Sequence, residues 1–202
     1  MSLKPQDICV LLKIFVLDRS PWSYTQLAYE LGMSASEVHA GVKRATEASL
    51  MRLEEGWGSP DAGALDELLV HGVRYVFTPA HSGLTRGMPT SFAAPSLSGV
   101  LDHDAGPPPV WPDTEGDVRG YGFSPLYRSV PFAARRDPRL YELLALVDAI
   151  RGGAEAARAA AIRELRRRLG TQPANGNTPS PGARRTAGTK AAVGRVKRGA
   201  NG

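Results

Sequence analysis

Cysteine, long apolar runs and known catalytic motifs are all scarce in this chain of 202 residues. The single cysteine, Cys9, has no partner for an internal disulfide, and its apolar neighbours predict a buried thiol in a reducing compartment. No apolar run reaches the ~18 residues of a membrane-spanning helix, and residues 1–7 lack the apolar stretch of a signal peptide. We therefore expect a cytoplasmic protein with no membrane partner.

Catalytic and metal-binding patterns are missing as well. The sequence contains no phosphate-binding glycine loop, no dinucleotide-binding glycine fingerprint, no HExxH and no CxxC, and its four histidines lack metal-ligand spacing. Asp102, His103 and Asp104 form one compact polar cluster, which is more typical of a turn built on aspartate side chains than of a metal or acid–base site. We therefore expect no enzyme activity, no cofactor and no metal site.

Glycine, proline and basic residues are plentiful, but the basic residues are unevenly placed. Residues 171–202 carry six Lys or Arg and no acidic residue, whereas residues 1–170 carry 19 basic and 20 acidic residues. The body is therefore close to neutral. The tail, made mainly of Gly, Ala, Pro, Asn and basic residues, cannot bury a core; we expect it to be disordered, either adding nonspecific DNA affinity or serving as a solubilising end.

The segment from residue 23 to residue 51 is the most informative part of the chain. Two pairs of residues have the spacing of a capping box, in which two side chains satisfy each other's backbone N–H at a helix start: Ser23 with Gln26, and Ser34 with Glu37. Gly32 stands where the first helix must end in a left-handed conformation. The pattern predicts two helices joined by a short turn, the second running from Ala35 to about Ser49, which is a helix-turn-helix.

The second of these helices separates its side chains by face. At about 100° per residue, one face carries Val38, Val42, Ala45 and Ser49, and the other carries Ser36, His39, Ala40, Lys43 and Glu47. A major groove admits a helix whose first residues are small and polar. We expect bases to be contacted by Ser36, His39, Ala40 and Lys43, and phosphates or the minor groove by Thr25, Arg44 and Arg86. The plainer alternative is an amphipathic helix in an ordinary helical protein.

The run TQLAYELGMSASEVHAGVKRATEASLM (residues 25–51) resembles bacterial winged helix-turn-helix regulators of the MarR-like kind. The resemblance rests on Leu27, Ala28, Leu31, Gly32, Met33, Ser34, Val38, Val42 and Leu50, and it extends over about residues 4–95. It implies a three-helix core with a β-hairpin wing that binds duplex DNA. We accordingly expect residues 1–95 to form the DNA-binding domain.

Two positions are open for the wing. After a helix from Asp61 to about His71, ended by Gly72, the run Val73–Phe77 has strong β preference, and residues 87–93 could return as its partner. This hairpin would place Arg86 near an exposed tip that can reach a minor groove. The alternative is a shorter wing within residues 50–61, which would leave the later hairpin a structural role.

The rest of the chain predicts a mainly helical protein with irregular segments. Residues 5–17 are predicted to form a helix that is apolar on nearly all sides, with Lys13 as the one break in the apolar run. Residues 96–136 read as a Pro/Gly-rich irregular strap with a polyproline-like strip, GPPPVWP, which packs on the body or serves a Pro-binding module. Residues 137–170 predict two helices, interrupted at Gly152 and Gly153, that pack on the first helix within one subunit or between two.

These patterns favour one function and leave one alternative. The first is sequence-specific binding of double-stranded DNA by a homodimeric transcriptional regulator. The alternative is an antitoxin-like adaptor, in which residues 94–170 dock a partner protein while the N-terminal half binds DNA.

Overall fold

Helices make up most of the computed structural model, which describes residues 2–54, 57–99 and 106–171. By its internal contacts the chain divides into two units, Met1–Gln172 and Pro173–Gly202. Residues 172–202, which include the second unit, lie outside the described residues, and so does the cluster of residues 102–104. The predictions of a disordered tail and of an aspartate turn are therefore untested. No helix among the described residues is long and apolar enough to cross a membrane.

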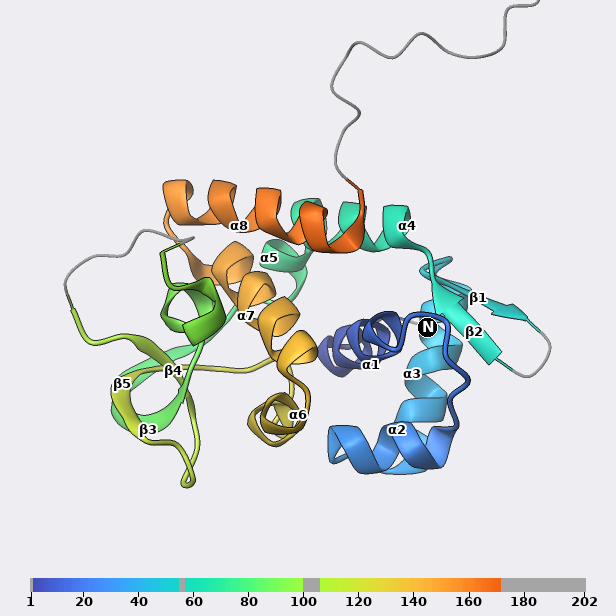
Figure 1. Cartoon of the computed structure of the whole chain (residues 1–202), viewed down its shortest axis with the longest axis horizontal. Helices are drawn as coiled ribbons and strands as arrows, with labels where there is room; N and C mark the ends of the chain where they lie inside the picture. The colour runs from blue at the N-terminus through green and yellow to red at the C-terminus, as the bar shows by residue number, and fades with distance from the viewer. Residues whose placement is uncertain (1, 55–56, 100–105, 172–202) are drawn as a thin grey trace, which may run out of the picture. The chain divides into compact units, whose positions relative to one another are not determined.

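The first three helices follow the predicted bounds closely (Figure 1). They are α1 (Pro5–Val16), α2 (Tyr24–Leu31) and α3 (Ala35–Glu47). The box at Ser34 and Glu37 is complete, with both reciprocal hydrogen bonds present. At Ser23 only half of the predicted box forms, because the Gln26 side chain donates to Glu30 at 3.0 Å instead of returning to the helix start.

The turn between α2 and α3 requires glycine for two reasons. Gly32 has φ +64°, in the left-handed region that suits glycine. A Cβ at this position would also lie 2.9 Å from the ring of Phe132, which packs against the turn. The turn is therefore fixed both by its own backbone and by a residue a hundred positions later.

A short antiparallel hairpin follows α3 directly. Strands β1 (Met51–Glu54) and β2 (Trp57–Pro60) pair with Met51 opposite Pro60. This is the shorter of the two hairpin positions that the sequence left open. Ser49, predicted on the packing face of α3, instead lies beyond its end, exposed and with φ +58°.

The predicted strand at Val73–Phe77 is wrong. Helix α4 (Ala62–Glu67) continues through a π-helical segment, η1 (Leu68–Gly72), into α5 (Val73–Val76). Leu65, Leu69 and Val73, four residues apart, are all fully buried, so helical periodicity outweighs the β preference of the valines. Gly72 keeps a right-handed helical conformation and does not end the helix.

The other strands form a small closed barrel. Strand β3 (His81–Pro89) pairs antiparallel with both β4 (Pro109–Pro112) and β5 (Val118–Phe123), and the last two pair in parallel. Residues 87–93, predicted as one returning strand, are instead the end of β3 and a 3-10 turn, η2 (Ser91–Ala93). The segment predicted as irregular thus holds two strands, with another 3-10 turn, η3 (Pro95–Leu97), and helix α6 (Val130–Arg136) on either side of them.

Two long helices complete the core. α7 (Pro138–Gly152) packs on α1 and on α8 (Glu155–Leu169), and the chain breaks between α7 and α8 at Gly153, as predicted. The apolar side chains of α1 are therefore buried within one chain, which is the intramolecular one of the two predicted packings. Its one interior cation, Lys13, lies 2.7 Å from both Glu30 and Asp137. Burial lowers the pKa of Lys13, but these two carboxylates outweigh it, and the pKa is raised overall.

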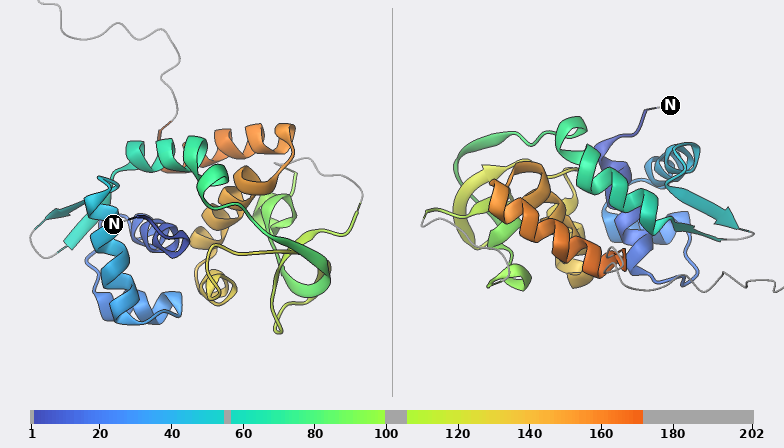
Figure 2. Two further views of the ribbon diagram at one scale, coloured as in Figure 1. Left: turned by 180° about the vertical axis from the view of Figure 1, so that it is seen from behind. Right: turned by 90° about the horizontal axis from the view of Figure 1, so that it is seen from above.

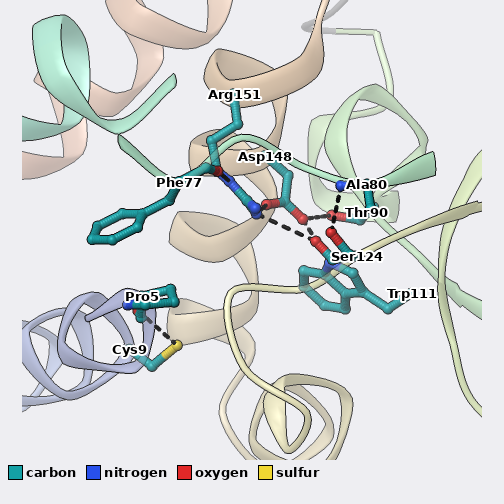
Figure 3. A network of polar contacts seen from close by, with 9 residues as sticks. All are labelled: Pro5, Cys9, Phe77, Ala80, Thr90, Trp111, Ser124, Asp148 and Arg151. Carbon is teal, nitrogen blue, oxygen red and sulfur yellow. Dashed lines mark hydrogen bonds and ion pairs between the residues drawn. The ribbon is translucent and has the colours of Figure 1, made fainter. Parts of the chain in front are cut away.

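A buried polar network ties the barrel to α7 (Figure 3). The carboxylate of Asp148 accepts hydrogen bonds from Trp111 Nε1 at 2.6 Å, from Thr90 Oγ1 at 2.9 Å and from Arg151 Nη1 at 2.6 Å. The Nε atom of Arg151 in turn donates to the carbonyl oxygen of Phe77 at 2.8 Å. Nearby Cys9 is almost fully buried, as predicted, and burial raises the pKa of its thiol.

Candidate nucleic-acid interface

Helix α3 presents the predicted polar face to solvent. Ser36, His39 and Lys43 are exposed and Ala40 is half-buried, while Val38, Val42 and Ala45 on the opposite face are buried in the core. Thr25, in the first turn of α2, is exposed as well. Five of the seven predicted contact residues therefore lie on or beside one surface.

A chain of aromatic rings joins this surface to the hairpin. Trp22 Nε1 donates to the carbonyl oxygen of Gly58 in β2 at 2.9 Å. The Trp22 ring meets Tyr24 edge-on at 5.5 Å between centroids, and Tyr24 meets His39 in the same way at 5.0 Å. The imidazole of His39 is thus oriented by Tyr24, although the residue remains exposed.

A shallow hollow of about 340 Å³ lies between α3 and the hairpin. Its lining comes from both elements and from the first turn of α2: Tyr24, His39, Val42, Lys43, Thr46, Glu47 and Leu53. Leu53 on β1 is half exposed there. The predicted contact face is therefore concave beside the hairpin, with one cation, Lys43, in its lining.

Arg44 does not belong to this surface, so its predicted phosphate contact is wrong. Its guanidinium forms a two-pronged pair with Asp7 of α1, Nε to Oδ2 at 2.7 Å and Nη2 to Oδ1 at 2.6 Å. Arg44 is only 7% exposed and Asp7 is 0% exposed. The carboxylate raises the pKa of Arg44, which stays charged and holds α3 against α1.

Arg86 is also placed elsewhere. It lies within β3, not at a hairpin tip beside α3. The views of Figures 1 and 2 put the β3–β5 barrel and the β1–β2 hairpin at opposite ends of the first unit. The Nε atom of Arg86 donates to the carbonyl oxygen of Gly116. Arg86 therefore cannot share a binding surface with α3 as the longer hairpin would have allowed.

The start of α3 is held by a residue that sequence reasoning did not find. The hydroxyl of Tyr127 donates to Glu37 Oε1 at 2.5 Å, and Ser129 Oγ donates to the carbonyl oxygen of Leu31 at 2.6 Å. The Tyr127 bond, followed by the bonds from Ser34, lowers the pKa of Glu37 to about 2. The Glu37 carboxylate is therefore fully ionised near neutral pH, and its hydrogen bonds commit it to the turn.

Two exposed arginines join the candidate interface. Arg128 lies over the ring of Tyr127, 5.6 Å from its centroid, and close enough to help lower the pKa of Glu37. Arg52 on β1 is exposed, with its side chain 2.9 Å from Asp61. The shorter hairpin position could have pointed to Arg52. Nothing local could have pointed to Arg128, because its link to α3 runs through a contact between residues 90 positions apart.

Comparison with protein-family models, with curated proteins and with solved structures finds no match. The part of the chain that the structure describes contains no group of three His, Cys, Asp or Glu side chains that could hold a metal ion.

Proposed function

We propose that the protein binds duplex DNA at specific sequences, with α3 in the major groove, as a homodimeric transcriptional regulator of the winged helix-turn-helix kind. In this proposal α1–α3 are the helical core and β1–β2 the wing. The observation that carries it is the solvent-facing polar side of a capped helix, α3, set directly beside a hairpin. A major groove about 12 Å wide admits one helix, and small side chains near its start allow close approach.

Each exposed residue has a distinct role in this proposal. Ser36 and His39 face base edges, and the imidazole supplies a donor or an acceptor whose direction Tyr24 fixes. Ala40 allows the helix to lie close to the bases. Lys43, one turn after His39, is here assigned a phosphate in place of the base contact expected from the sequence, because a lysine acts as a point charge toward the backbone. The Thr25 hydroxyl donates a hydrogen bond to the phosphate backbone beside α2.

The small number of cations on this surface makes each of them important. Phosphate neutralisation supplies much of the affinity of DNA-binding proteins, and Arg44 is unavailable for it. Arg52 and Arg128 take its place in the proposal, one from the hairpin and one beside the start of α3. A homodimer would double these contacts and bind two half-sites about one helical turn apart. Sedimentation of the protein with and without its duplex tests that stoichiometry.

A fluorescence-anisotropy titration tests the proposal directly. The full chain is titrated against a duplex from the gene's own upstream region and against a scrambled duplex, at two salt concentrations. Lys43→Ala should weaken binding to both duplexes and flatten the salt dependence by about one phosphate contact. Arg163→Ala, an exposed arginine on α8 with no recorded ion pair, is the matched control and should bind as the wild type does.

Sequence preference is tested by a second variant. His39→Ala should reduce the ratio between the two duplexes rather than the affinity for both. A chain ending at Gly170, which lacks the six basic residues of the tail, should keep that ratio. Binding that ignores sequence and disappears with the tail would contradict the proposal, and so would unchanged behaviour of both the Lys43 and the His39 variants.

A further inference from the structure

Two arginines oppose each other on the outer face of the barrel. In the antiparallel register of β3 and β5, Arg86 is the direct partner of Arg119, and both are exposed. Directly opposed residues of antiparallel strands project from the same face with Cβ atoms about 5 Å apart, and like charges so placed repel. The fold therefore retains an unfavourable pair of cations.

The two cations of this pair are direct cross-strand partners, and no carboxylate among the described residues forms an ion pair with either of them. Elsewhere on the described chain, arginines are commonly held by carboxylates: Arg44 by Asp7, Arg52 by Asp61, Arg135 by Asp113, Arg151 by Asp148 and Arg166 by Asp66. Within the described ranges, neither Arg86 nor Arg119 has an ion pair. Among the described residues, the Arg86 side chain makes one hydrogen bond, from Nε to the carbonyl oxygen of Gly116, and the Arg119 side chain makes none.

Apolar side chains continue the same face. Leu84 and Tyr121 are also direct partners, two residues along each strand, so they project on the same side as the arginines. Each of them is 50% exposed. A hollow of about 410 Å³ opens here, lined by Leu84, Thr85, Arg86, Asp117, Val118 and Arg119. We name the four exposed residues Leu84, Arg86, Arg119 and Tyr121 the barrel patch.

We propose that the barrel patch docks an acidic segment of a partner protein, one that carries carboxylates beside an apolar side chain. Two unpaired guanidinium groups match carboxylates in both charge and planar geometry. Leu84 and Tyr121 supply the apolar contact, and Arg and Tyr are the residue types enriched where protein interfaces are strongest.

The same features disfavour a nucleic acid on this patch. A duplex backbone is uniformly anionic and makes little use of exposed Leu or Tyr side chains. Asp117 in the hollow repels any anion, but a peptide can also offer it a backbone N–H or a side-chain hydroxyl donor, which a phosphate chain lacks. The patch also lies at the opposite end of the first unit from the hairpin beside α3 (Figures 1 and 2), so one straight duplex beside α3 would not reach it.

A peptide titration tests the docking. The probe is a fluorescein-labelled peptide that alternates Glu and Asp with Leu and Phe, and its control carries Gln and Asn in place of the acids. The full wild-type chain should bind the acidic peptide and not the control. Arg86→Gln with Arg119→Gln should weaken that binding at least about tenfold, the scale of a central interface residue. Arg139→Gln with Arg163→Gln, two exposed arginines elsewhere, removes the same charge and should have no effect.

Further variants separate the possible outcomes. Arg119→Gln alone leaves the Gly116 contact of Arg86 intact and should still weaken binding, which guards against a simple folding defect. Lys43→Ala should leave peptide binding unchanged, so the docking and the proposed DNA binding can fail separately. The docking proposal would be overturned by absence of peptide binding at roughly millimolar concentration, or by equal binding of the control peptide. It would also be overturned if the Arg86 and Arg119 substitutions impaired duplex binding or dissociated a dimer instead of reducing peptide binding.

Discussion

The helical region from α1 to α3 and the barrel of β3 to β5 use opposite means to fix their structure. The helices begin and end at residues that can be recognised from their near neighbours in the sequence. Gly32 ends α2, and the capping box of Ser34 and Glu37 begins α3. The barrel depends on the pairing of β3 with residues that lie 21 to 42 positions later in the chain, and it has glycines where strands approach closely. Caps can therefore be recognised in the sequence, whereas the close approach of two backbones can be recognised only in the folded chain.

The two regions also differ in how they treat charge. In the helical region the interior cations are neutralised within the chain, Lys13 by Glu30 and Asp137, and Arg44 by Asp7. On the barrel, Arg86 and Arg119 face each other without a carboxylate partner. The first arrangement stabilises the fold, and the second leaves charge available for a partner.

The largest loss of stability in the helical region is expected from removal of Arg44. Arg44→Ala leaves the carboxylate of Asp7 buried without its cation, so we expect a loss of about 3–5 kcal/mol in the free energy of unfolding. Chemical denaturation followed by circular dichroism measures it. Arg52→Ala, which breaks an exposed pair with Asp61, is the control and should cost less than about 1 kcal/mol. Recovery of stability in Asp7→Leu with Arg44→Met would identify the uncompensated charge as the cause.

Substitution of a glycine at a close strand approach should destabilise the barrel. A Cβ at Gly120 would overlap the carbonyl oxygen of Pro108, so Gly120→Ala should destabilise the protein by about 1–3 kcal/mol through forced backbone shifts. A Cβ at Gly83, on β3 of the same barrel, would meet nothing within 4 Å, so Gly83→Ala is the matched control. Hydrogen exchange should show faster exchange of β3–β5 amides in the first variant only. Equal effects of the two substitutions would contradict the close approach seen in the structure.

A smaller effect tests the hydrogen bond between Tyr127 and Glu37 at the start of α3. Because the pKa of Glu37 is lowered to about 2, its contribution to stability is present above the ordinary carboxyl pKa of 4.5 and is lost as pH falls toward 2. Tyr127→Phe should raise the pKa of Glu37 and cost no more than about 1 kcal/mol near neutral pH, since the pair is only partly buried. The stability difference from wild type should shrink between about pH 5 and pH 2.

The carboxyl pKa of Glu37 can be followed by NMR across that titration. Tyr121→Phe, at a half-exposed residue, removes a hydroxyl that makes no hydrogen bond among the described residues, and it should leave both the Glu37 pKa and the stability unchanged. A Glu37 pKa that stays near 2 in the Tyr127 variant would show that the capping box alone lowers it.

The smallest effect on folding should come from Lys43. It is exposed on α3 and has no recorded ion pair, so Lys43→Ala should change the free energy of unfolding by no more than about 0.5 kcal/mol. Thermal unfolding measures this directly. Removal of Arg44, the next residue, should reduce the free energy of unfolding most. The two neighbouring residues would then have separate roles, Lys43 in binding and Arg44 in folding. A large stability loss in the Lys43 variant would remove that distinction.

The sequence predicted the helical half well for a physical reason. Caps, helix-ending glycines and apolar periodicity act within a few residues, and they located α1, α2, α3, α7 and α8. The same logic failed at Val73, where a buried helical stripe outweighed a local β preference. It also failed for the barrel, because Gly- and Pro-rich strands carry little β preference of their own.

For the candidate site the limit was similar. The face of α3 follows from angular spacing alone, and Ser36, His39 and Lys43 are exposed as that spacing predicts. Spacing could not show that Arg44 meets Asp7 across 37 positions, because the partner lies on another helix. The same holds for Arg128 and Tyr127, whose place beside Glu37 depends on the fold of the later chain.

The separation of Glu37 from Tyr127 also has a consequence in time. Translation proceeds at about 5–20 residues per second, so a gap of 90 residues delays the tyrosine by about 5 to 20 s after Glu37 is made. All the residues of the Asp7–Arg44 pair and of the box at Ser34 are synthesised well before Tyr127. We infer that a nascent or prematurely ended chain carries the whole α3 surface before Tyr127 is available to hold its start. Limited proteolysis of ribosome-bound chains ending before and after residue 127 would detect the tightening as a loss of cleavage between α2 and α3.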